Sequence, residues 1–372
     1  MSFSRNHSPK VVIAHGIIGS DDAIGNDILG MHDLFACMGL EALLAAELLL
    51  PGLPSRLKTA DVTASSSVNG DLLIYHHSIY WKLGEELLER FRGEIIFRYH
   101  NVTPSYFFRS YSPVLTELSE EGVRQTRNLV RQFTNNIWLA ASELSRRELL
   151  MIGADPHKVF VIPPFNLGEQ FFARARQNGS AVRVLFVGRF VPNKRHRDLL
   201  EIAHSYVSHF GNNIEINLVG PVDIVNLDGY VREIVQLIID LGLRDNVRIW
   251  GAVSFEVLRE LFRSSSAFLC CSRHEGFCLP VIEAQAAGVP VLGVNAGALA
   301  ETLGPNQIVY KAPTSPDDYR LFAFTIKELA SEGELRERVV RDGYRNVITR
   351  FTSEIIENAL LTRLLPVFDK LR

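Results

Sequence analysis

Short β-branched runs alternate with longer amphipathic stretches along the chain, and this alternation occurs twice. In the first half, the apolar runs predict strands at Val11–His15, Leu72–Tyr75, Ile95–His100, Trp138–Ala141 and Val159–Ile162. The stretches between them have helical spacing, at Ala23–Met38, Ile79–Arg92, Leu115–Phe133 and Glu143–Ile152. The first half is therefore predicted to form one α/β unit.

The second half begins the same pattern again. It predicts strands at Arg183–Val187, Ile214–Val219, Val247–Trp250, Ala267–Cys270 and Val289–Val294. The helices are expected at Asp198–His209, Tyr230–Leu241, Phe255–Ser264, Pro280–Ala287 and Asp317–Ser331. Near-continuous apolar strands that alternate with helices are typical of parallel sheets covered on both faces. Two such series predict an α/β protein with two doubly wound, Rossmann-like domains.

The boundary between the two domains is predicted after Pro163-Pro164, in the polar stretch 166–180. We expect the first domain at 1–165 and the second at 181–350. The last segment, 351–372, is amphipathic but has no strand of its own, so it is expected to form a C-terminal helix. Because open α/β sheets bind ligands beyond the carboxyl ends of their strands, the strand-to-helix loops are where chemistry is expected.

Composition and charge narrow the class of protein. The 372 residues are 47% hydrophobic and 22% charged, as in an ordinary soluble protein. The formal net charge of −3 argues against broad nucleic-acid binding. The polar N-terminus and the charges within the most apolar run, Leu40–Leu53, predict a cytoplasmic protein without a membrane span.

The four cysteines predict free thiols in a reducing compartment. They are Cys37, Cys270, Cys271 and Cys278. The adjacency of Cys270 and Cys271 suits neither a disulfide framework nor a CxxC metal knuckle. Adjacent residues of a strand point to opposite faces, so we expect no zinc site in the cluster that also includes His274.

The most informative loop follows the strand predicted to end at Cys270. It reads Ser272-Arg273-His274-Glu275-Gly276-Phe277-Cys278-Leu279-Pro280-Val281-Ile282-Glu283-Ala284. Pro280 suits the first turn of a helix, and the amides of that turn form a ready anion site. Glu275 lies before the helix and Glu283 lies near its start. The two carboxylates are predicted to accept hydrogen bonds from hydroxyl groups on either side of a diphosphate, although Glu283 would equally well stabilise the helix dipole.

A second loop carries two cations directly after a buried strand. In Gly188-Arg189-Phe190-Val191-Pro192-Asn193-Lys194, the glycine lets the backbone turn close to a ligand. Arg189 and Lys194 are positioned to converge on a diphosphate. The alternative is that both are solvated charges, since Arg195 and Arg197 follow at once.

Motifs that the chain lacks exclude other nucleotide chemistry. There is no GxGxxG fingerprint, no GK pair of a P-loop and no GxSxG elbow. DxD is also absent, so the usual acidic clamp for a metal–nucleotide complex is not offered. We therefore expect no metal and no cofactor.

Two motifs together resemble family 4 of the retaining glycosyltransferases, which have the GT-B fold. They are EGFxLPxxEA, in which Glu275 and Glu283 lie eight positions apart, and the upstream GRxxxxK. Further matches are Gly220, Trp250-Gly251-Ala252-Val253-Ser254, Gly288-Val289-Pro290-Val291, Ala141-Ser142-Glu143 and Val161-Ile162-Pro163-Pro164. The resemblance implies an N-terminal acceptor domain and a C-terminal donor domain that face a central cleft. It also implies that helix 351–372 crosses back to the N-terminal domain.

The resemblance also implies roles for individual residues in binding a nucleotide-sugar donor. Arg189 and Lys194 would neutralise the diphosphate, Glu283 would bind the ribose and Glu275 the donor hexose. Backbone at Gly188, Gly220, Phe277, Cys278 and Leu279 would approach sugar or phosphate, and Ala252 and Val253 would face the base. The family usually has glycine where Cys278 stands, which puts the local geometry in doubt.

In the first domain, the resemblance places His100 against the donor sugar near the reacting carbon. Residues Gly25 and Asn26, in the loop and helix start after the first strand, would let phosphate or acceptor approach. From the residues alone, His100 could equally cap the following helix. We predict His100, Arg189, Lys194 and Glu275 as the catalytic set.

The expected function is metal-independent, retaining transfer of a hexose to a saccharide or lipid-linked acceptor in polysaccharide biosynthesis. UDP-glucose is the favoured donor and GDP-mannose the next. A glycoside hydrolase would leave the basic loop unexplained. A two-lobed sugar-binding protein without catalysis, or a phosphorylase or synthase of the same fold, are the alternatives.

A peripheral membrane contact is a further expectation. Aromatic residues including Phe107 and Phe108 come just after His100, and Arg124, Arg127 and Arg131 share one helix face. An aromatic tip beside a basic face is typical of reversible membrane attachment. The alternative is that the aromatic run folds into the core of the first domain.

Overall fold

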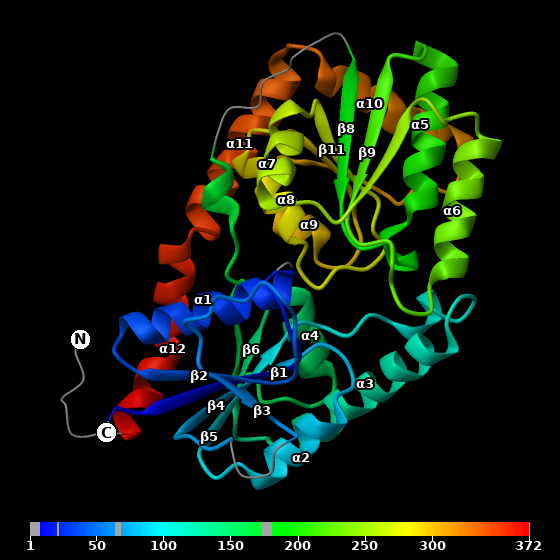
Figure 1. Cartoon of the computed structure of the whole chain (residues 1–372). Helices are drawn as coiled ribbons and strands as arrows, with labels where there is room; N and C mark the ends of the chain where they lie inside the picture. The colour runs from blue at the N-terminus through cyan, green and yellow to red at the C-terminus, as the bar shows by residue number, and fades with distance from the viewer. Residues whose placement is uncertain (1–7, 21, 64–67, 173–180, 372) are drawn as a thin grey trace. The chain divides into compact units, whose positions relative to one another are not determined.

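The computed structural model describes residues 8–20, 22–63, 68–172 and 181–371, and it divides the chain into two compact units (Figure 1). The first unit comprises residues 1–102, 118–166 and 351–372. The second comprises residues 103–117 and 167–350. Each unit contains one parallel sheet covered by helices.

The sheet of the first unit has seven parallel strands in the order β3-β2-β1-β4-β5-β6-β7. They are β1 (Lys10–Ile18), β2 (Glu41–Leu49), β3 (Thr59–Asp61), β4 (Leu72–His77), β5 (Glu94–Tyr99), β6 (Ile137–Ala140) and β7 (Val159–Val161). The helices between them are α1 (Ala23–Cys37), α2 (Lys82–Arg90), α3 (Pro113–Gln132) and α4 (Glu143–Met151). The doubly wound arrangement predicted from the sequence is confirmed here.

The strand β2 was not predicted. Its sequence, Glu41-Ala-Leu-Leu-Ala-Ala-Glu-Leu-Leu, is rich in residues that favour helices. It nevertheless pairs in parallel with β1 over nearly its whole length, from Lys10↔Glu41 to Ile18↔Leu49. Burial between two neighbouring strands overrides local propensity here, as tertiary context often does.

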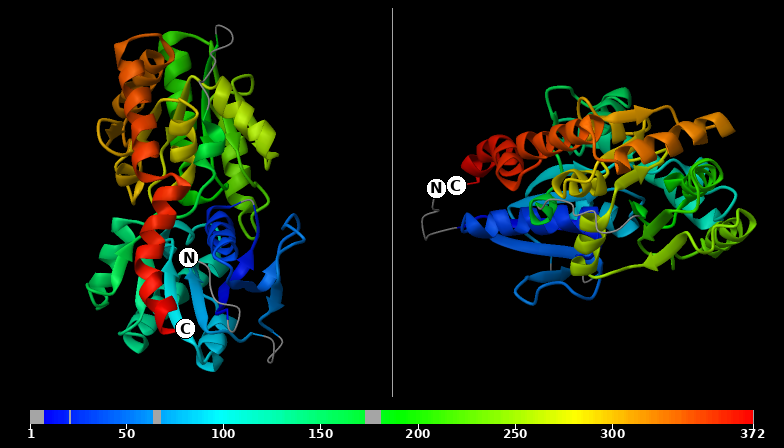
Figure 2. Two further views of the ribbon diagram at one scale, coloured as in Figure 1. Left: turned by 90° about the vertical axis from the view of Figure 1, so that its left-hand side faces the viewer. Right: turned by 90° about the horizontal axis from the view of Figure 1, so that it is seen from above.

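The C-terminal helix α12 (Ser353–Lys370) packs in the first unit. Its ribbon lies along the first unit (Figure 2). Its buried face joins the same hydrophobic core as α1 and β1, through Ile356, Leu360, Leu364, Val367 and Phe368. The Phe368 ring meets the Phe35 ring of α1 edge-on, with centroids 5.8 Å apart. The last helix is therefore part of the N-terminal unit, as the sequence predicted.

The sheet of the second unit has six parallel strands in the order β10-β9-β8-β11-β12-β13. They are β8 (Val182–Val187), β9 (Ile214–Val219), β10 (Val247–Gly251), β11 (Ala267–Cys270), β12 (Val291–Val294) and β13 (Ile308–Tyr310). The helices are α5 (His196–Phe210), α6 (Asp228–Asp240), α7 (Phe255–Ser264), α8 (Leu279–Ala286), α9 (Leu299–Leu303), α10 (Pro316–Ala330) and α11 (Glu334–Arg350). β8 lies centrally, at the point where the strand order reverses, and such points are where open α/β sheets bind ligands.

The segment 103–117 belongs to the second unit, although we expected all of 1–165 in the first. Phe108 is buried against Val191 and Leu227, and Tyr111 donates a hydrogen bond to Glu233 at 2.9 Å. The half-buried Phe107 ring lies 6.3 Å from the ring of His274. Phe108 is therefore not exposed as a membrane-facing tip would require, whereas membrane contact itself stays a prediction.

On α3, Arg124, Arg127 and Arg131 are exposed, with Arg124 paired to Glu121. Among the described residues, no helix is both long and apolar enough to cross a bilayer.

Candidate functional site

Lys194 and Glu275 come together at the carboxyl edge of the second sheet. Lys194 ends a short 3₁₀ turn after β8, and Glu275 lies in the loop after β11. The Nζ atom of Lys194 donates to both carboxylate oxygens of Glu275, at 2.7 and 2.9 Å. Their side chains are only 15% and 8% exposed. Two residues 81 positions apart thus form one buried ion pair at the edge where a ligand is expected.

Lys194 is a permanent cation in this setting. Burial is the largest single influence and opposes its charge, but the Glu275 carboxylate and the nearby Cys278 and Cys270 together outweigh it, so the pKa of Lys194 lies above its ordinary value. A charged ammonium group at this edge can interact with an anionic ligand without deprotonating. The alternative that Lys194 is merely a solvated charge is excluded by its burial.

The other cations of this loop have different partners. Arg195 pairs with the buried Asp198 at 2.9 Å, and Arg197 pairs with Glu233 at 2.8 Å. Arg189 is exposed. Of the two cations that the sequence analysis selected, Lys194 is largely buried beside Glu275, whereas Arg189 is exposed.

The backbone of Glu275 is fixed by residues that the sequence analysis missed. Gly297, with φ of +57°, lies so close that an added Cβ would approach the Glu275 amide nitrogen to 2.5 Å. Ala298 donates its amide to the Glu275 carbonyl at 2.9 Å. The buried Asn193 donates from its side chain to the His274 carbonyl at 3.1 Å and accepts from the Arg273 amide. The loop is therefore built around the position of Glu275.

The start of α8 offers backbone amides without a side-chain cap. Cys278, its N-cap residue, adopts a left-handed conformation with φ of +83° and makes no capping hydrogen bond. Pro280 occupies the first turn, as predicted. Uncapped amides at a helix start, together with the helix dipole, attract an anion. Phe277, Cys278 and Leu279 lie at this helix start, where the sequence placed them.

Glu283 is buried within α8 and is 7% exposed. Burial raises the pKa of its carboxyl to about 7. Among the described residues, no side-chain hydrogen-bond partner is recorded for it. A buried carboxyl group in this state gains most from a ligand that brings hydroxyl donors.

Three consecutive strand ends carry glycines that bring the neighbouring loops close together. Gly188 donates its amide to Val219, and Gly220 donates to Gly251, at 2.8 and 2.9 Å. Gly220 has φ of +137°, and a Cβ there would come within 2.2 Å of the Gly188 carbonyl oxygen. Ala252 is exposed and Val253 half-buried just beyond β10. The predicted binding glycines thus set the course of the backbone along this edge.

His100, in the first unit, belongs to a separate buried cluster. Its Nε2 atom lies 2.9 Å from Nδ1 of His76 and 3.6 Å from an oxygen of Asp27. Burial, reinforced by the nearby Arg98, holds the pKa of His100 well below its ordinary value. The ring is therefore neutral at pH 7 and suited to hydrogen bonding rather than to charge neutralisation.

The start of α1 differs from the start of α8 because it is already capped. The Asp22 side chain accepts from the amides of Ile24 and Gly25 at 2.8 and 2.7 Å. The Asn26 amide donates to the Asp22 carbonyl. At Gly25 an added Cβ would come within 1.8 Å of the Gly19 carbonyl oxygen, so the glycine is needed for packing. The Asp22 side chain therefore already occupies amides that a phosphate or acceptor was predicted to approach. The binding role of Gly25 and Asn26 stays a prediction.

Two groups of side chains in the described residues have metal-ligating atoms within 4.8 Å of one another, Asp27/His76/His100 and Cys270/Glu275/Cys278. In each group a protein cation already occupies the carboxylate. Arg98 donates to Asp27 at 2.6 Å, and Lys194 donates to Glu275. We assign no metal to either group.

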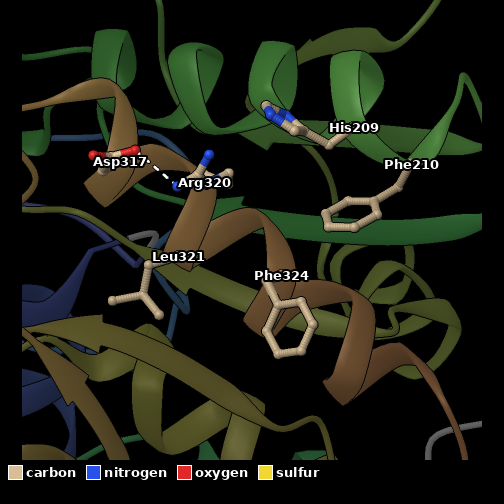
Figure 3. A pocket seen from close by; sticks show the side chains of 6 residues that line it. All are labelled: His209, Phe210, Asp317, Arg320, Leu321 and Phe324. Atoms are coloured by element: carbon tan, nitrogen blue, oxygen red, sulfur yellow. Dashed lines mark ion pairs between the residues drawn. The ribbon is translucent and has the colours of Figure 1, made fainter.

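A surface hollow of about 450 Å³ lies elsewhere in the second unit, between α5 and α10 (Figure 3). It is lined by His209, Phe210, Asp317, Arg320, Leu321 and Phe324. His209 and Phe210 end α5, whereas Lys194 lies just before the opposite end of this helix. The hollow is therefore not part of the Lys194–Glu275 site.

Residues 169–346 match the family described as glycosyl transferases group 1. The matched residues cover most of the second unit and just under half of the chain, so the second unit is similar to the group 1 glycosyl transferases. This is the family that the EGFxLPxxEA motif indicated. The matched residues include Lys194, Glu275 and Glu283.

Curated relatives match parts of this chain. A D-inositol 3-phosphate glycosyltransferase of Geodermatophilus obscurus is 34% identical over 158 residues, 40% of this chain and 35% of the relative. An MMP alpha-(1->4)-mannosyltransferase of Mycolicibacterium hassiacum is 36% identical over 117 residues, 32% of this chain and 28% of the relative. The chain thus spans about a third of the length of these relatives.

The fold extends the likeness beyond the matched residues. The Anabaena protein HepE, solved in complex with UDP-glucose, has a TM-score of 0.72 at 17% identity, covering 96% of this chain and 100% of that chain. At this identity the likeness concerns the fold alone. Two Rossmann-like sheets with a C-terminal helix returning to the first unit make this a GT-B fold.

Proposed function

We propose that this chain is a retaining glycosyltransferase that moves a hexose from a nucleotide sugar to an acceptor hydroxyl. The observation that carries the proposal is the buried Lys194–Glu275 pair next to the uncapped start of α8. It places a fixed cation, free-standing amide dipoles and a carboxylate at one sheet edge. A diphosphate attached to a sugar needs this combination, because one part of the ligand is anionic and the other is rich in hydroxyl donors.

The chemical task is to stabilise the departing nucleoside diphosphate. Negative charge develops on its phosphate oxygens as the bond to the anomeric carbon breaks. Lys194 and the α8 amides, with Arg189 at the surface, supply positive potential that is already in place before the reaction. Donors preorganised in this way are each worth roughly 10²–10³ in rate. No step then needs a metal ion to carry the charge.

The two glutamates are given separate tasks. We assign Glu275 to hydroxyl groups of the transferred hexose, because it is tied to Lys194 and its backbone is fixed by Gly297. We assign Glu283 to the ribose, because its buried carboxyl has no recorded side-chain partner and would accept hydroxyl donors. The neutral His100 is assigned to hydrogen bonding with the donor sugar.

For the donor we propose UDP-glucose first and GDP-mannose next. HepE, whose fold is similar, was solved with UDP-glucose, whereas the relative from Mycolicibacterium hassiacum is named a mannosyltransferase. A thermal-shift panel of nucleotide sugars separates the two donors. At 100 times its Kd, a ligand that binds only the folded protein stabilises it by about 2.7 kcal/mol.

For the acceptor we propose a saccharide or a lipid-linked sugar in polysaccharide biosynthesis. A lipid-linked acceptor requires the enzyme to visit a membrane, and the exposed Arg127 and Arg131 of α3 offer a basic face for that contact. Sedimentation of the wild type and of Arg127→Glu/Arg131→Glu with anionic liposomes at low salt tests it. If neither protein sediments, the acceptor is a soluble saccharide.

The decisive experiment follows UDP release from UDP-glucose and compares two single variants. Glu275→Ala should reduce turnover far more than UDP affinity, whereas Glu283→Ala should weaken binding of UDP itself. A wild-type protein that binds the nucleotide sugar but never releases UDP with any acceptor would be a binding protein. Wild-type behaviour in both variants would show that the residue assignment is wrong.

A further inference from the structure

Two of the four cysteines face each other beside the Lys194–Glu275 pair. The Sγ atoms of Cys270 and Cys278 and a carboxylate oxygen of Glu275 all lie within 4.8 Å of one another. Each thiol is the main influence on the pKa of the other. Cys270 ends β11 and Cys278 is the residue just before the first turn of α8. The loop between them is the one that carries Glu275.

The surroundings shift the pKa values of the two thiols in opposite directions. The hydrogen bond from Cys278 is the main cause that lowers the pKa of Cys270, and the Ser272 hydroxyl, 3.4 Å from Cys270 Sγ, adds to it. The same contact raises the pKa of Cys278 well above its ordinary value. Glu275 opposes a negative charge here and Lys194 favours it. A thiolate held by a second thiol and a nearby cation is the reactive form of cysteine.

The other two cysteines lack this arrangement. Cys271 is buried just after β11, where Asp198 and Arg273 are among its charged neighbours, and burial raises its pKa well above the ordinary value. Cys37 is exposed and lies in the first unit. Cys278 is 9% exposed and Cys270 is 1% exposed, so a small oxidant can approach this pair from the side of Cys278.

From this geometry we infer that Cys270 and Cys278 form a dithiol that a hydroperoxide converts to a disulfide, and that this bond turns off donor use. The loss of donor turnover rests on the proposed function, whereas the formation of the disulfide does not. The Cys270 thiolate attacks one peroxide oxygen, the O–O bond breaks, and a sulfenic acid and one water form after a proton is taken up. The Cys278 sulfur then attacks the sulfenic sulfur, and the hydroxyl leaves as a second water. Two thiols and one H₂O₂ thus give one disulfide and two waters, with both electrons passing to the peroxide.

The new bond would strain the site. A disulfide brings its sulfur atoms to about 2 Å, so the two ends of the Glu275 loop must be drawn together. Cys278 already has a left-handed backbone, and its movement would shift the first amides of α8. A misplacement of about 1 Å at a reacting site can cost about 10² in rate, and we expect a loss of donor turnover of this order that a dithiol reductant reverses.

Peptide mapping tests the disulfide without any assay of function. Trypsin cleaves after Arg263, Arg273 and Lys311, so Cys270 and Cys278 fall in peptides 264–273 and 274–311. We expect these two peptides to be joined after a molar excess of H₂O₂, and to separate after reduction. Cys271 shares the first peptide with Cys270, so variants must decide between them. The link should persist in Cys271→Ser and disappear in Cys270→Ser.

The possible results distinguish the formation of the disulfide from its effect on donor turnover. No linked peptide in the oxidised wild type, or a link that survives in Cys270→Ser, overturns the dithiol. If Cys270→Ser does not fold, Cys278→Ser and Cys278→Gly replace it, and both should lack the link. If the disulfide-linked protein turns over donor as fast as the protein with both thiols reduced, the proposed switch is wrong. A linked protein in a preparation that never releases UDP leaves the dithiol standing and counts against the proposed function.

Discussion

Arg98 donates a hydrogen bond to Asp27 at 2.6 Å, and both side chains are completely buried. The other oxygen of Asp27 accepts from the amide of Phe165, and Arg98 also donates to the Ile162 carbonyl. One ion pair therefore connects α1, β5 and the segment that leaves the first unit. The neutral His100 lies against the same carboxylate.

Arg98→Met should destabilise the first unit by about 3–5 kcal/mol, because it leaves the Asp27 carboxylate buried without its partner. Urea unfolding followed by tryptophan fluorescence in a Trp250→Phe background measures this, since the remaining Trp81 and Trp138 both lie in the first unit. The double variant Asp27→Leu/Arg98→Met should recover much of the loss. An unchanged urea midpoint in Arg98→Met would mean that the pair adds nothing to stability.

Lys194→Ala should lower kcat/KM for the donor by a factor of roughly 10² or more, because it removes a preorganised cation. Arg189→Ala is expected to lower it similarly if the exposed side chain reaches the diphosphate. Arg197→Ala is the matched control, since its guanidinium pairs with Glu233 instead. Equal activity of Lys194→Ala and Arg197→Ala would refute the role of Lys194.

UDP binding should tighten as pH rises through about 7, where Glu283 titrates. Its folded pKa is raised, so the carboxyl is protonated below pH 7 and accepts ribose hydroxyls poorly. If only the ionised form binds well, affinity changes about tenfold between pH 6 and pH 8. Calorimetry of the wild type and Glu283→Gln measures it. The variant corrects for ionisation of the UDP phosphate, and identical pH profiles would contradict the assignment.

The same titration has a consequence for stability. Because the folded pKa lies above the usual value of a glutamate, the folded state holds this proton more tightly than the unfolded state does. The contribution of Glu283 to stability is therefore most favourable at low pH and declines as pH rises from about 4.5 to about 7. Glu283→Gln should remove this decline from the wild-type unfolding curve.

Gly297→Ala should disturb Glu275 through the backbone. A Cβ at this left-handed position meets the Glu275 amide at 2.5 Å, and the strained conformation itself costs about 1–3 kcal/mol. We expect donor turnover to fall at least about tenfold while the secondary structure stays intact. Gly229→Ala, in the open first turn of α6, is the control and should behave like the wild type. Full activity of Gly297→Ala would show that Glu275 can shift without harm.

Chelation should leave donor turnover largely intact, because the Lys194 ammonium already provides the positive charge that a metal would supply. Turnover in EDTA compared with turnover in added Mn²⁺ measures this. Complete loss in EDTA with recovery in Mn²⁺ would overturn the metal-independent mechanism.

The sequence predicted the fold because its strands are buried on both faces and therefore read as continuous apolar runs. It also predicted that the Lys194 and Glu275 loops share one sheet edge, since all strands of a parallel sheet end on the same side. β2 escaped this reasoning because alanine, leucine and glutamate carry no strand signal of their own. Nothing local distinguishes Glu41–Leu49 from a helix until β1 lies beside it.

The residues that fix the backbone of the site were also hard to predict, because they act through contacts between distant parts of the chain. Gly297 and Asn193 act on the backbone of residues that are distant in sequence, and neither belongs to a motif with a fixed spacing. The expectation that alternation separates Cys270 from Cys271 holds only within a strand, and β11 ends at Cys270. It does not reveal that the left-handed turn at Cys278 returns a third thiol to Cys270.

The place of α12 in the first unit has a consequence for how the protein is made. Synthesis proceeds from the N-terminus, and the sheet of the first unit is complete once β7 has left the ribosome. Its core nevertheless lacks Ile356, Leu360, Leu364 and Phe368 until the whole second unit has followed. The nascent first unit therefore keeps an open apolar face while the second unit is made, and α12 covers this face only afterwards.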